Sequence, residues 1–384
     1  MIMNWEKENS IGNLFIVLIT LMALSTLSKI AFHIYTEYSL YIMLVYSMLV
    51  IFMSGNMLKG FFMFIIIFFA YLIYAVAYSG GGFGSILTAL LFLLILNSYT
   101  YFDLKESICR YLVMFSSFLI LFLFIRSFAY AEDFYYYRYN SINQNTMSMY
   151  IIYFFMIRFT VLDLNNKAKT ISTLVLFVIS LIALQNYSAR GCTISLIFFG
   201  CLNLIFRKKY SVNAILFITT LVVAFGIAFP AFYLSLYRNN IDFMAFGKNL
   251  YTGREAIWNS MFNALNQNKM NWLFGLGSKA ILWKGHSLNV HNDYFGVMVN
   301  FGVIGFALYY GFIFKLVVKI AEIARYNKIA RKGLFMYISG VLLLGSSEVT
   351  TMWTTIYPLV CFGLGIGCRI YKKSLIFKGC SNDS

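Results

Sequence analysis

Apolar stretches of about twenty residues recur along this chain, and they limit its fold more than any other feature of the sequence. The hydrocarbon core of a bilayer needs roughly 20 apolar residues per helix. Of the residues, 61% are hydrophobic and only 11% are charged, whereas about a quarter are charged in an ordinary soluble domain. The sequence therefore predicts an all-α, polytopic integral membrane protein with about 12 transmembrane helices, centred near residues 20, 46, 68, 91, 119, 155, 178, 199, 223, 305, 341 and 363.

Domain boundaries are not evident in the sequence. It contains 2 prolines and 26 glycines and no linker-like or low-complexity segment, and we find no repeat of fixed period. We therefore predict a single membrane domain over residues 1–384. Residues 11–30 lack a small-residue cleavage site after them, so we expect a retained first helix rather than a signal peptide.

The positions of Lys and Arg predict an orientation, because these residues gather in cytoplasmic loops. With the N-terminus inside, the inner segments hold most of the basic residues, including Arg207, Lys208 and Lys209. This assignment puts both termini in the cytoplasm and turns two segments outward: an aromatic loop at 130–145 and a long outer loop at 236–290. We expect a multi-pass membrane protein.

The sequence lacks the residues that several classes of protein function require. The net charge of +16 is spread over many short loops, which indicates topology and contact with anionic membrane lipids rather than binding of nucleic acid. With 14 Asp and Glu and 3 His, there is no metal-binding motif, so we expect no metal. Gly275-Leu276-Gly277 lacks the third glycine of a dinucleotide site and reads as a turn. The 6 cysteines imply no disulfide framework.

Between residues 251 and 305, motifs rich in polar residues and glycine follow one another in a chain that is otherwise mostly apolar. In order they are Gly253-Arg254 with Trp258 after it, Gly275-Leu276-Gly277, His291-Asn292, and Gly302-Val303-Ile304-Gly305 opening an apolar helix. This order resembles the shared core of the O-antigen polymerase and O-antigen ligase superfamily, best between residues 181 and 312. The resemblance implies a C-type glycosyltransferase-like fold that acts on undecaprenyl-diphosphate-linked sugars, with no metal or other cofactor.

Two arginines are candidates for binding the leaving diphosphate. Arg190 follows Ser188 at the outward turn between the seventh and eighth predicted helices, where an arginine is costly unless it is paired or hydrated; the alternative is a side chain that snorkels to lipid phosphate. Arg254 follows Thr252, which could cap a short helix, and could be a solvated charge of its first turn. The resemblance implies that both guanidinium groups grip phosphate oxygens, which they can do bidentately.

His291 is the candidate general base. An imidazole can accept a proton from a sugar hydroxyl near neutral pH, and Asn292 and Asp293 could fix its tautomer. The alternative is a polar helix cap or an interfacial histidine. His286 is a second candidate for substrate binding, and we expect His33 to be interfacial only.

Further candidates for substrate binding lie on other segments. Arg126, near the outer end of the fifth helix, could join the anion site, and Glu348, at the outward end of the eleventh, could pair with one of the arginines. Asn145 lies in an Asn-x-Asn-Thr turn that resembles a recurrent element of the same family. Arg158 lies nearer the inner end of the sixth helix, and we expect it to snorkel.

Tyr136 and Tyr137 lie in the aromatic loop. Their rings could stack on sugars, but tyrosines form membrane-interface belts equally often.

Three functions are compatible with these residues. The first is a polymerase that joins lipid-linked oligosaccharide repeat units, as donor and acceptor, with inversion, at the periplasmic face of the bacterial cytoplasmic (inner) membrane, where the loop at 236–290 would lie. A polysaccharide chain-length regulator is a candidate partner whose binding the sequence leaves open. The second is a ligase that transfers the finished glycan to lipid A core. The third is a flippase of the lipid-linked oligosaccharide, which should show charges along a central path and a two-half repeat, whereas the polar candidates here gather around two outer loops.

Overall fold

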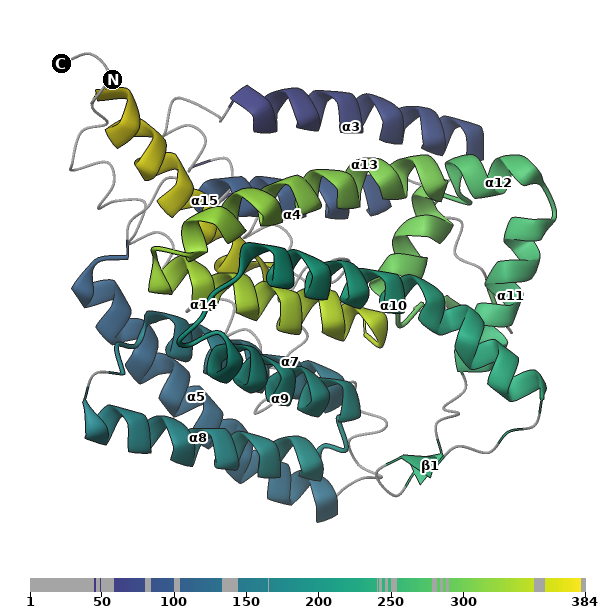
Figure 1. The fold of residues 1–384 in the computed structure, drawn as a ribbon. Coiled ribbons are helices and arrows are strands. Elements are labelled where there is room, and N and C mark those ends of the chain that lie inside the picture. The colour runs from purple at the N-terminus through teal and green to yellow at the C-terminus, as the bar shows by residue number, and fades with distance from the viewer. Residues whose placement is uncertain are drawn as a thin grey trace.

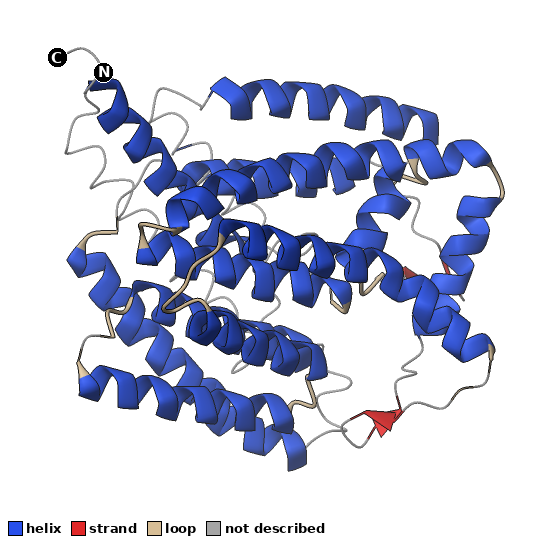
Figure 2. Cartoon of the chain, viewed as in Figure 1, coloured by secondary structure: helices blue, strands red, loops and turns tan. Residues whose placement is uncertain are grey.

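The computed structural model describes residues 45, 49, 59–79, 84–99, 104–132, 144–164, 166–239, 241, 244–245, 248–249, 254–277, 282–283, 286–287, 290–348 and 356–380. Nearly all of the regular structure in this part of the chain is helical (Figure 1 and Figure 2). The helices are α3 (Lys59–Ser79), α4 (Gly84–Ser98), α5 (Glu106–Glu132), α7 (Gln144–Val161), α8 (Lys167–Asn186), α9 (Arg190–Ile205), α10 (Val212–Arg238), α11 (Arg254–Asn266), α12 (Lys269–Phe274), α13 (Asp293–Ala324), α14 (Lys328–Tyr337) and α15 (Tyr357–Cys380).

Short non-α elements complete this part of the chain. A π-helix, η2 (Ile338–Leu343), and a 3-10 turn, η3 (Leu344–Ser346), continue α14. Two antiparallel ladders lie between α10 and α13: β1 (Met244–Ala245) with β2 (Lys248–Asn249), and β3 (Leu282–Trp283) with β4 (His286–Ser287). The segment predicted as a long loop at 236–290 therefore contains two helices, α11 and α12.

Five of the described helical segments are long and apolar enough to cross a membrane: Glu106–Phe128, Lys167–Asn186, Val212–Arg238, Asp293–Ala324 and Lys328–Ser346. Shorter apolar helices cover Met63–Ala75, Ala89–Ser98 and Arg190–Ile205. The predicted helix centres from residue 68 to residue 363 each fall in a helix. The centres near 20 and 46 lie outside the described residues, so the count of twelve stays a prediction.

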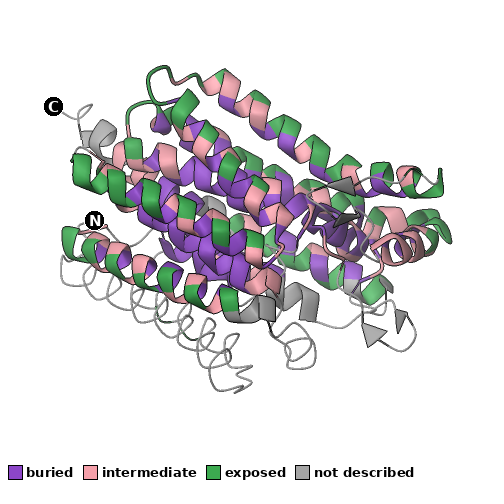
Figure 3. Cartoon of the chain, turned by 90° about the horizontal axis from the view of Figure 1, so that it is seen from below, coloured by how far each residue is buried: buried purple, intermediate pink, exposed green. Residues whose placement is uncertain are grey.

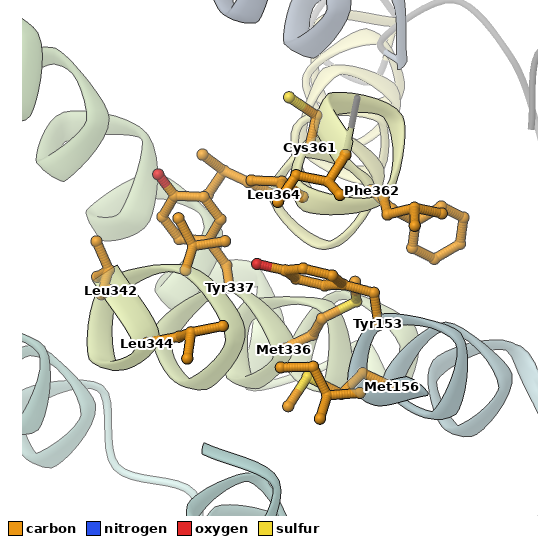
Figure 4. Close-up of a cluster of buried hydrophobic side chains, with 14 of the residues drawn as sticks. Tyr153, Met156, Met336, Tyr337, Leu342, Leu344, Cys361, Phe362 and Leu364 are labelled. Atoms are coloured by element: carbon orange, nitrogen blue, oxygen red, sulfur yellow. The ribbon is translucent and has the colours of Figure 1, made fainter. Parts of the chain in front are cut away.

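The core is apolar and is centred on α7. Its residues Met147–Ile157 are all buried, and the helix packs against α5, α8, α9, α14 and α15. Exposed residues, coloured green in Figure 3, lie mainly on the outer helices. In the close-up of Figure 4, Tyr153 of α7 points toward α14, η2 and α15, and its hydroxyl donates to the carbonyl oxygen of Gly340 at 2.5 Å. The center of the bundle is thus held mainly by packing.

Arg158 corrects a prediction, because it does not snorkel. The residue is only 4% exposed. Its Nε donates to Ser117 Oγ at 2.9 Å, its Nη1 to Thr173 Oγ1 at 2.9 Å, and its Nη2 to Ser172 Oγ at 3.0 Å. Hydroxyls from α5 and α8 therefore replace water around the guanidinium, which the sequence of α7 alone could not reveal.

The two ends of the bundle differ in their residues. At one end lie the turns that join α7 to α8, α9 to α10 and α13 to α14, which carry or border Lys167, Lys169, Arg207, Lys208, Lys209, Arg325 and Lys328. At the other end lie the start of α7, the α8–α9 turn, the start of α13 and the end of η3, together with α11 and α12 at the right of Figure 1. This second end, the α11–α12 end, carries the polar residues described next.

Candidate active site

A cavity of about 900 Å³ opens at the α11–α12 end of the bundle. It brings together residues from α7, the α8–α9 turn, α10, α11, the start of α13 and the end of η3. Its polar residues include Gln144, Asn145, Ser188, Arg190, Tyr233, Arg254, His291, Ser346, Ser347 and Glu348, and its apolar residues include Ile194, Phe225, Phe229, Ile257 and Leu343. The arrangement gives one cavity both a charged wall and an apolar wall.

Glu348 connects three of the predicted site residues. Asn145 Nδ2 donates to both carboxylate oxygens, at 3.1 Å each. Arg254 Nη2 donates to Oε1 at 3.0 Å, so the expected pairing of Glu348 with an arginine is present. His291 Nδ1 lies 3.7 Å from Oε2. The carboxylate thus joins α7, α11 and the residue before the N-cap of α13.

Arg190 reaches the same cavity as the first residue of α9. The turn before it is tight: Ser188 has φ of 56°, a left-handed conformation that is uncommon for a residue with a side chain. Asn186 Nδ2 donates to Ser127 Oγ at 3.0 Å and the Tyr187 hydroxyl donates to the carbonyl oxygen of Leu123 at 3.0 Å. These bonds fix the α8–α9 turn on α5 and therefore fix where α9 and Arg190 begin.

Trp258 holds Arg254 and His291 in place. It is fully buried in a small apolar cluster between α10, α11 and α13 that includes Tyr233 and Phe295. Its indole Nε1 donates to the carbonyl oxygen of Val290 at 2.6 Å, one residue before His291. Because Trp258 lies one helical turn after Arg254, the same packing sets the position of both functional side chains.

His291 has φ of 51°, in the left-handed region. A residue keeps a strained backbone conformation only where the surrounding structure stabilises it, and such residues often occur at functional sites. The cap of α13 is Asn292, whose Oδ1 accepts from the backbone N–H of Phe295 at 2.7 Å. The helix-cap alternative for His291 is therefore wrong.

The side chain of Asn292 makes its hydrogen bonds to backbone groups. Its Nδ2 donates to the carbonyl oxygens of Gly226, at 3.1 Å, and Ser346, at 2.7 Å. The sequence suggested that Asn292 and Asp293 could fix the tautomer of His291, whereas the group that lies 3.7 Å from its Nδ1 is the carboxylate of Glu348.

The glycine motifs lock α12 onto α13. Gly275 and Gly277 have positive φ, which confirms the predicted turn, and the backbone N–H groups of Leu276 and Gly277 donate to the carbonyl oxygens of Val299 and Asn300 at 2.7 and 3.1 Å. α13 begins at Asp293, and Gly302, with φ of 67°, breaks it into two helical segments, so the Gly302–Gly305 motif opens the second of these segments. A side chain at Gly302 would collide with the carbonyl group of Leu273. Because glycine has no side chain, α12 can approach α13 closely at this point.

The other predicted site residues are not among the described residues that line this cavity. Arg126 is half-buried on α5 and is not among the described residues that line the cavity. His286 lies in β4, where only the backbone is described. Tyr136 and Tyr137 lie outside the described residues, as does Thr252. Within the described ranges, no group of three or more His, Cys, Asp and Glu side chains could hold a metal ion.

Two contributors to the site were missed by the sequence analysis. One is the anchoring role of Trp258, although a tryptophan in a polar segment one turn after Arg254 was a usable signal. The other is Tyr233 on α10, which lines the cavity and donates to Glu255 Oε2 at 3.2 Å. Nothing in the local pattern of α10 separates this tyrosine from the many others.

Comparison with known proteins agrees with this geometry. Residues 173–310 match the family model described as O-Antigen ligase. The matched segment includes Arg190, Arg254 and His291. No curated protein matches the sequence significantly. Residues 173–310 of this multi-pass membrane protein are therefore similar to the O-antigen ligase and polymerase superfamily.

Proposed function

We propose that this protein is a glycosyltransferase that polymerises undecaprenyl-diphosphate-linked oligosaccharide repeat units into O-antigen or another surface polysaccharide. The observation that carries the proposal is the single cavity in which Arg190, Arg254 and His291 meet, although they come from three separate segments. Two guanidinium groups suit a diphosphate, and an imidazole suits a sugar hydroxyl. The match to the O-Antigen ligase model over the same segment supports this class of reaction.

In the proposed reaction the acceptor hydroxyl attacks the anomeric carbon of the donor sugar. The bond from that carbon to the diphosphate oxygen breaks as the new glycosidic bond forms, with inversion. His291 takes the hydroxyl proton, and Arg190 and Arg254 stabilise the negative charge on the departing diphosphate. Fixed arginines in a cavity of low polarity can supply this stabilisation without a metal.

The apolar wall of the cavity fits the lipid part of such a donor. Ile194 of α9 and Phe225 of α10 line the cavity and are still 47% and 48% exposed. Both lie on apolar helices, so these side chains would face lipid. We propose that the diphosphate occupies the charged wall while the isoprenoid chain leaves past these residues.

The charge distribution supports a periplasmic site. The bundle end opposite the cavity carries Arg207, Lys208, Lys209 and the other basic residues of the inner turns. By the tendency of Lys and Arg to stay in the cytoplasm, the cavity would face the periplasm of the inner membrane, with both termini cytoplasmic. This orientation can be tested with single cysteines placed at exposed Tyr326 and in the α11–α12 segment. Each cysteine is then treated with a membrane-impermeant thiol reagent and its labelling is measured.

A deletion strain tests the proposed function. Loss of a polymerase should leave surface glycan capped with single repeat units on a gel. In a second experiment, chain elongation by the purified protein should be measured on a lipid-linked repeat unit, with and without excess chelator. Elongation that stops on chelation and returns with Mg²⁺ or Mn²⁺ would overturn the metal-free reaction.

A ligase is the second candidate, because the family model that matches is described by that name. The same three side chains would serve it, since only the acceptor differs. The deletion strain separates the two: loss of a ligase leaves unmodified lipid A core together with polymer that is still lipid-linked. Co-purification with a chain-length regulator would favour the polymerase.

A further inference from the structure

Glu348 poses a problem for an anion-binding cavity. Among the described residues that line the cavity, Glu348 alone has an acidic side chain. This side chain is only 10% exposed. A carboxylate beside a diphosphate would weaken donor binding by repulsion, and burying it costs free energy unless it is paired. Its presence requires a compensating role.

The contacts of Glu348 indicate what that role is. Both carboxylate oxygens face protein groups: Asn145 donates to each, Arg254 donates to Oε1, and His291 Nδ1 is next to Oε2. Little of the carboxylate is left to receive a sugar hydroxyl. Arg254 and His291 are more open, with side chains 20% and 29% exposed, so these two can face the substrate while Glu348 lies behind them.

The backbone around Glu348 is built to hold it at this place. The chain reaches it through η2 and η3, and the backbone N–H of Glu348 donates to the carbonyl oxygen of Leu344 at 2.9 Å. Asn292 binds the carbonyl oxygen of Ser346 at 2.7 Å, which ties the same turn to the start of α13. Glu348 and His291 are therefore fixed relative to each other through the backbone as well as through their side chains.

We propose that Glu348 is a positioning residue that sets the geometry of the base and of one phosphate-binding arginine together. This inference rests on the proposed glycosyl transfer. With Oε2 beside Nδ1, the imidazole would keep its Nδ1 proton toward Glu348 and present Nε2 to the acceptor hydroxyl, because the partner of one ring nitrogen fixes the role of the other. Oε1 restrains one end of the Arg254 fork and leaves the rest of it for phosphate.

Glu348→Gln is the test, because glutamine keeps the size of the side chain and removes its charge. We expect kcat to fall by roughly tenfold to a hundredfold, a loss no larger than the one expected from removing the base itself, while KM for the acceptor stays within about twofold. Glu348→Asp keeps the charge and should recover part of kcat. Glu322→Gln makes the same change at an exposed position near the far end of α13 and should leave kcat unchanged.

A double variant shows whether Glu348 acts through His291. If it does, the loss in His291→Ala combined with Glu348→Gln should be clearly smaller than the two single losses added as activation free energies, because residues that act as a unit are not additive. Any loss beyond that of His291→Ala is the part that passes through Arg254. Additive losses would overturn the inference, and so would a raised acceptor KM with native kcat, which would make Glu348 a substrate ligand. Gel filtration and thermal unfolding of each variant identify any loss of folding.

The readouts also separate the inference from the proposed function. Wild-type protein that transfers no sugar from any lipid-linked donor would overturn both. Active wild-type protein with Glu348→Gln at the native rate would overturn only the role of Glu348.

Discussion

Arg158 and Arg254 have opposite surroundings in this molecule. Arg158 donates to three hydroxyls, from Ser117, Ser172 and Thr173, in the packed interior between α5, α7 and α8. Arg254 donates to the carboxylate of Glu348 and lines an open cavity. In the first, neutral dipoles accept from all three nitrogens of the guanidinium. In the second, one nitrogen is restrained and the rest of the fork can face a ligand. The comparison teaches that the surroundings of an arginine in a mostly apolar chain, and not its residue type alone, decide whether it is a candidate for binding a ligand.

The largest effect should come from Arg190→Ala or Arg254→Ala. Each should lower elongation by roughly a hundredfold to a thousandfold, the usual loss when one charge-stabilising donor is removed. Lysine should rescue poorly at either position, because it is a point charge and not a fork. The measurement is product formed from a defined lipid-linked repeat unit by purified protein.

Arg238→Ala is the matched control for these variants. Arg238 is exposed at the end of α10 and donates to Asn259 Oδ1 at 2.6 Å, outside the described lining of the cavity. It should retain native turnover. Long polysaccharide at normal levels from Arg190→Ala or Arg254→Ala would contradict the role given to the pair.

His291→Ala should come next, with turnover lower by roughly a hundredfold or more. Donor binding should stay nearly intact, because the diphosphate is held by the arginines. Binding of labelled donor and turnover should be measured on the same preparation, with His286→Ala as the comparison that loses less. Loss of donor binding in His291→Ala would make the histidine a ligand rather than a base.

Gly302→Ala should lower the stability of the fold, and not only the rate of the reaction. Its φ of 67° is unfavourable for alanine, and the added methyl would collide with the Leu273 carbonyl that α12 presents. We expect a loss of roughly 1–3 kcal/mol, seen as a lower midpoint of thermal unfolding in detergent. Gly311→Ala, on the same helix with open space around it, should be neutral or stabilising. Equal midpoints would show that the kink at Gly302 is not fixed by this contact.

The smallest effect on turnover should come from Arg158→Met. The hydroxyls that it leaves keep backbone acceptors, since Ser117 donates to Val113 at 2.7 Å and Thr173 to Lys169 at 2.8 Å. The free energy gained by no longer burying a charge offsets the free energy lost with the three hydrogen bonds. The free energy of unfolding should therefore change by no more than about 1–2 kcal/mol. Turnover per folded molecule should match the wild type. A large loss of turnover would remove the distinction between the two arginines.

The sequence determined the fold class and the identity of the main polar residues. Apolar stretches near the length of a bilayer predicted helices, because the backbone must satisfy its own hydrogen bonds in lipid. The order of Gly253-Arg254, His291-Asn292 and the glycine motifs predicted the resemblance to the O-antigen ligase and polymerase superfamily that the match over residues 173–310 confirms. These features are local, so they can be read along the chain.

The tertiary structure decided which of these residues meet. Glu348 lies 94 positions from Arg254 and 203 from Asn145 in the sequence, and no local pattern links such distant residues. Packing also placed Arg126 outside the described lining of the cavity and surrounded Arg158 with hydroxyls. Whether a charged side chain faces a ligand, a partner or lipid depends on which neighbouring helix lies beside it, and that is set only when the helices pack.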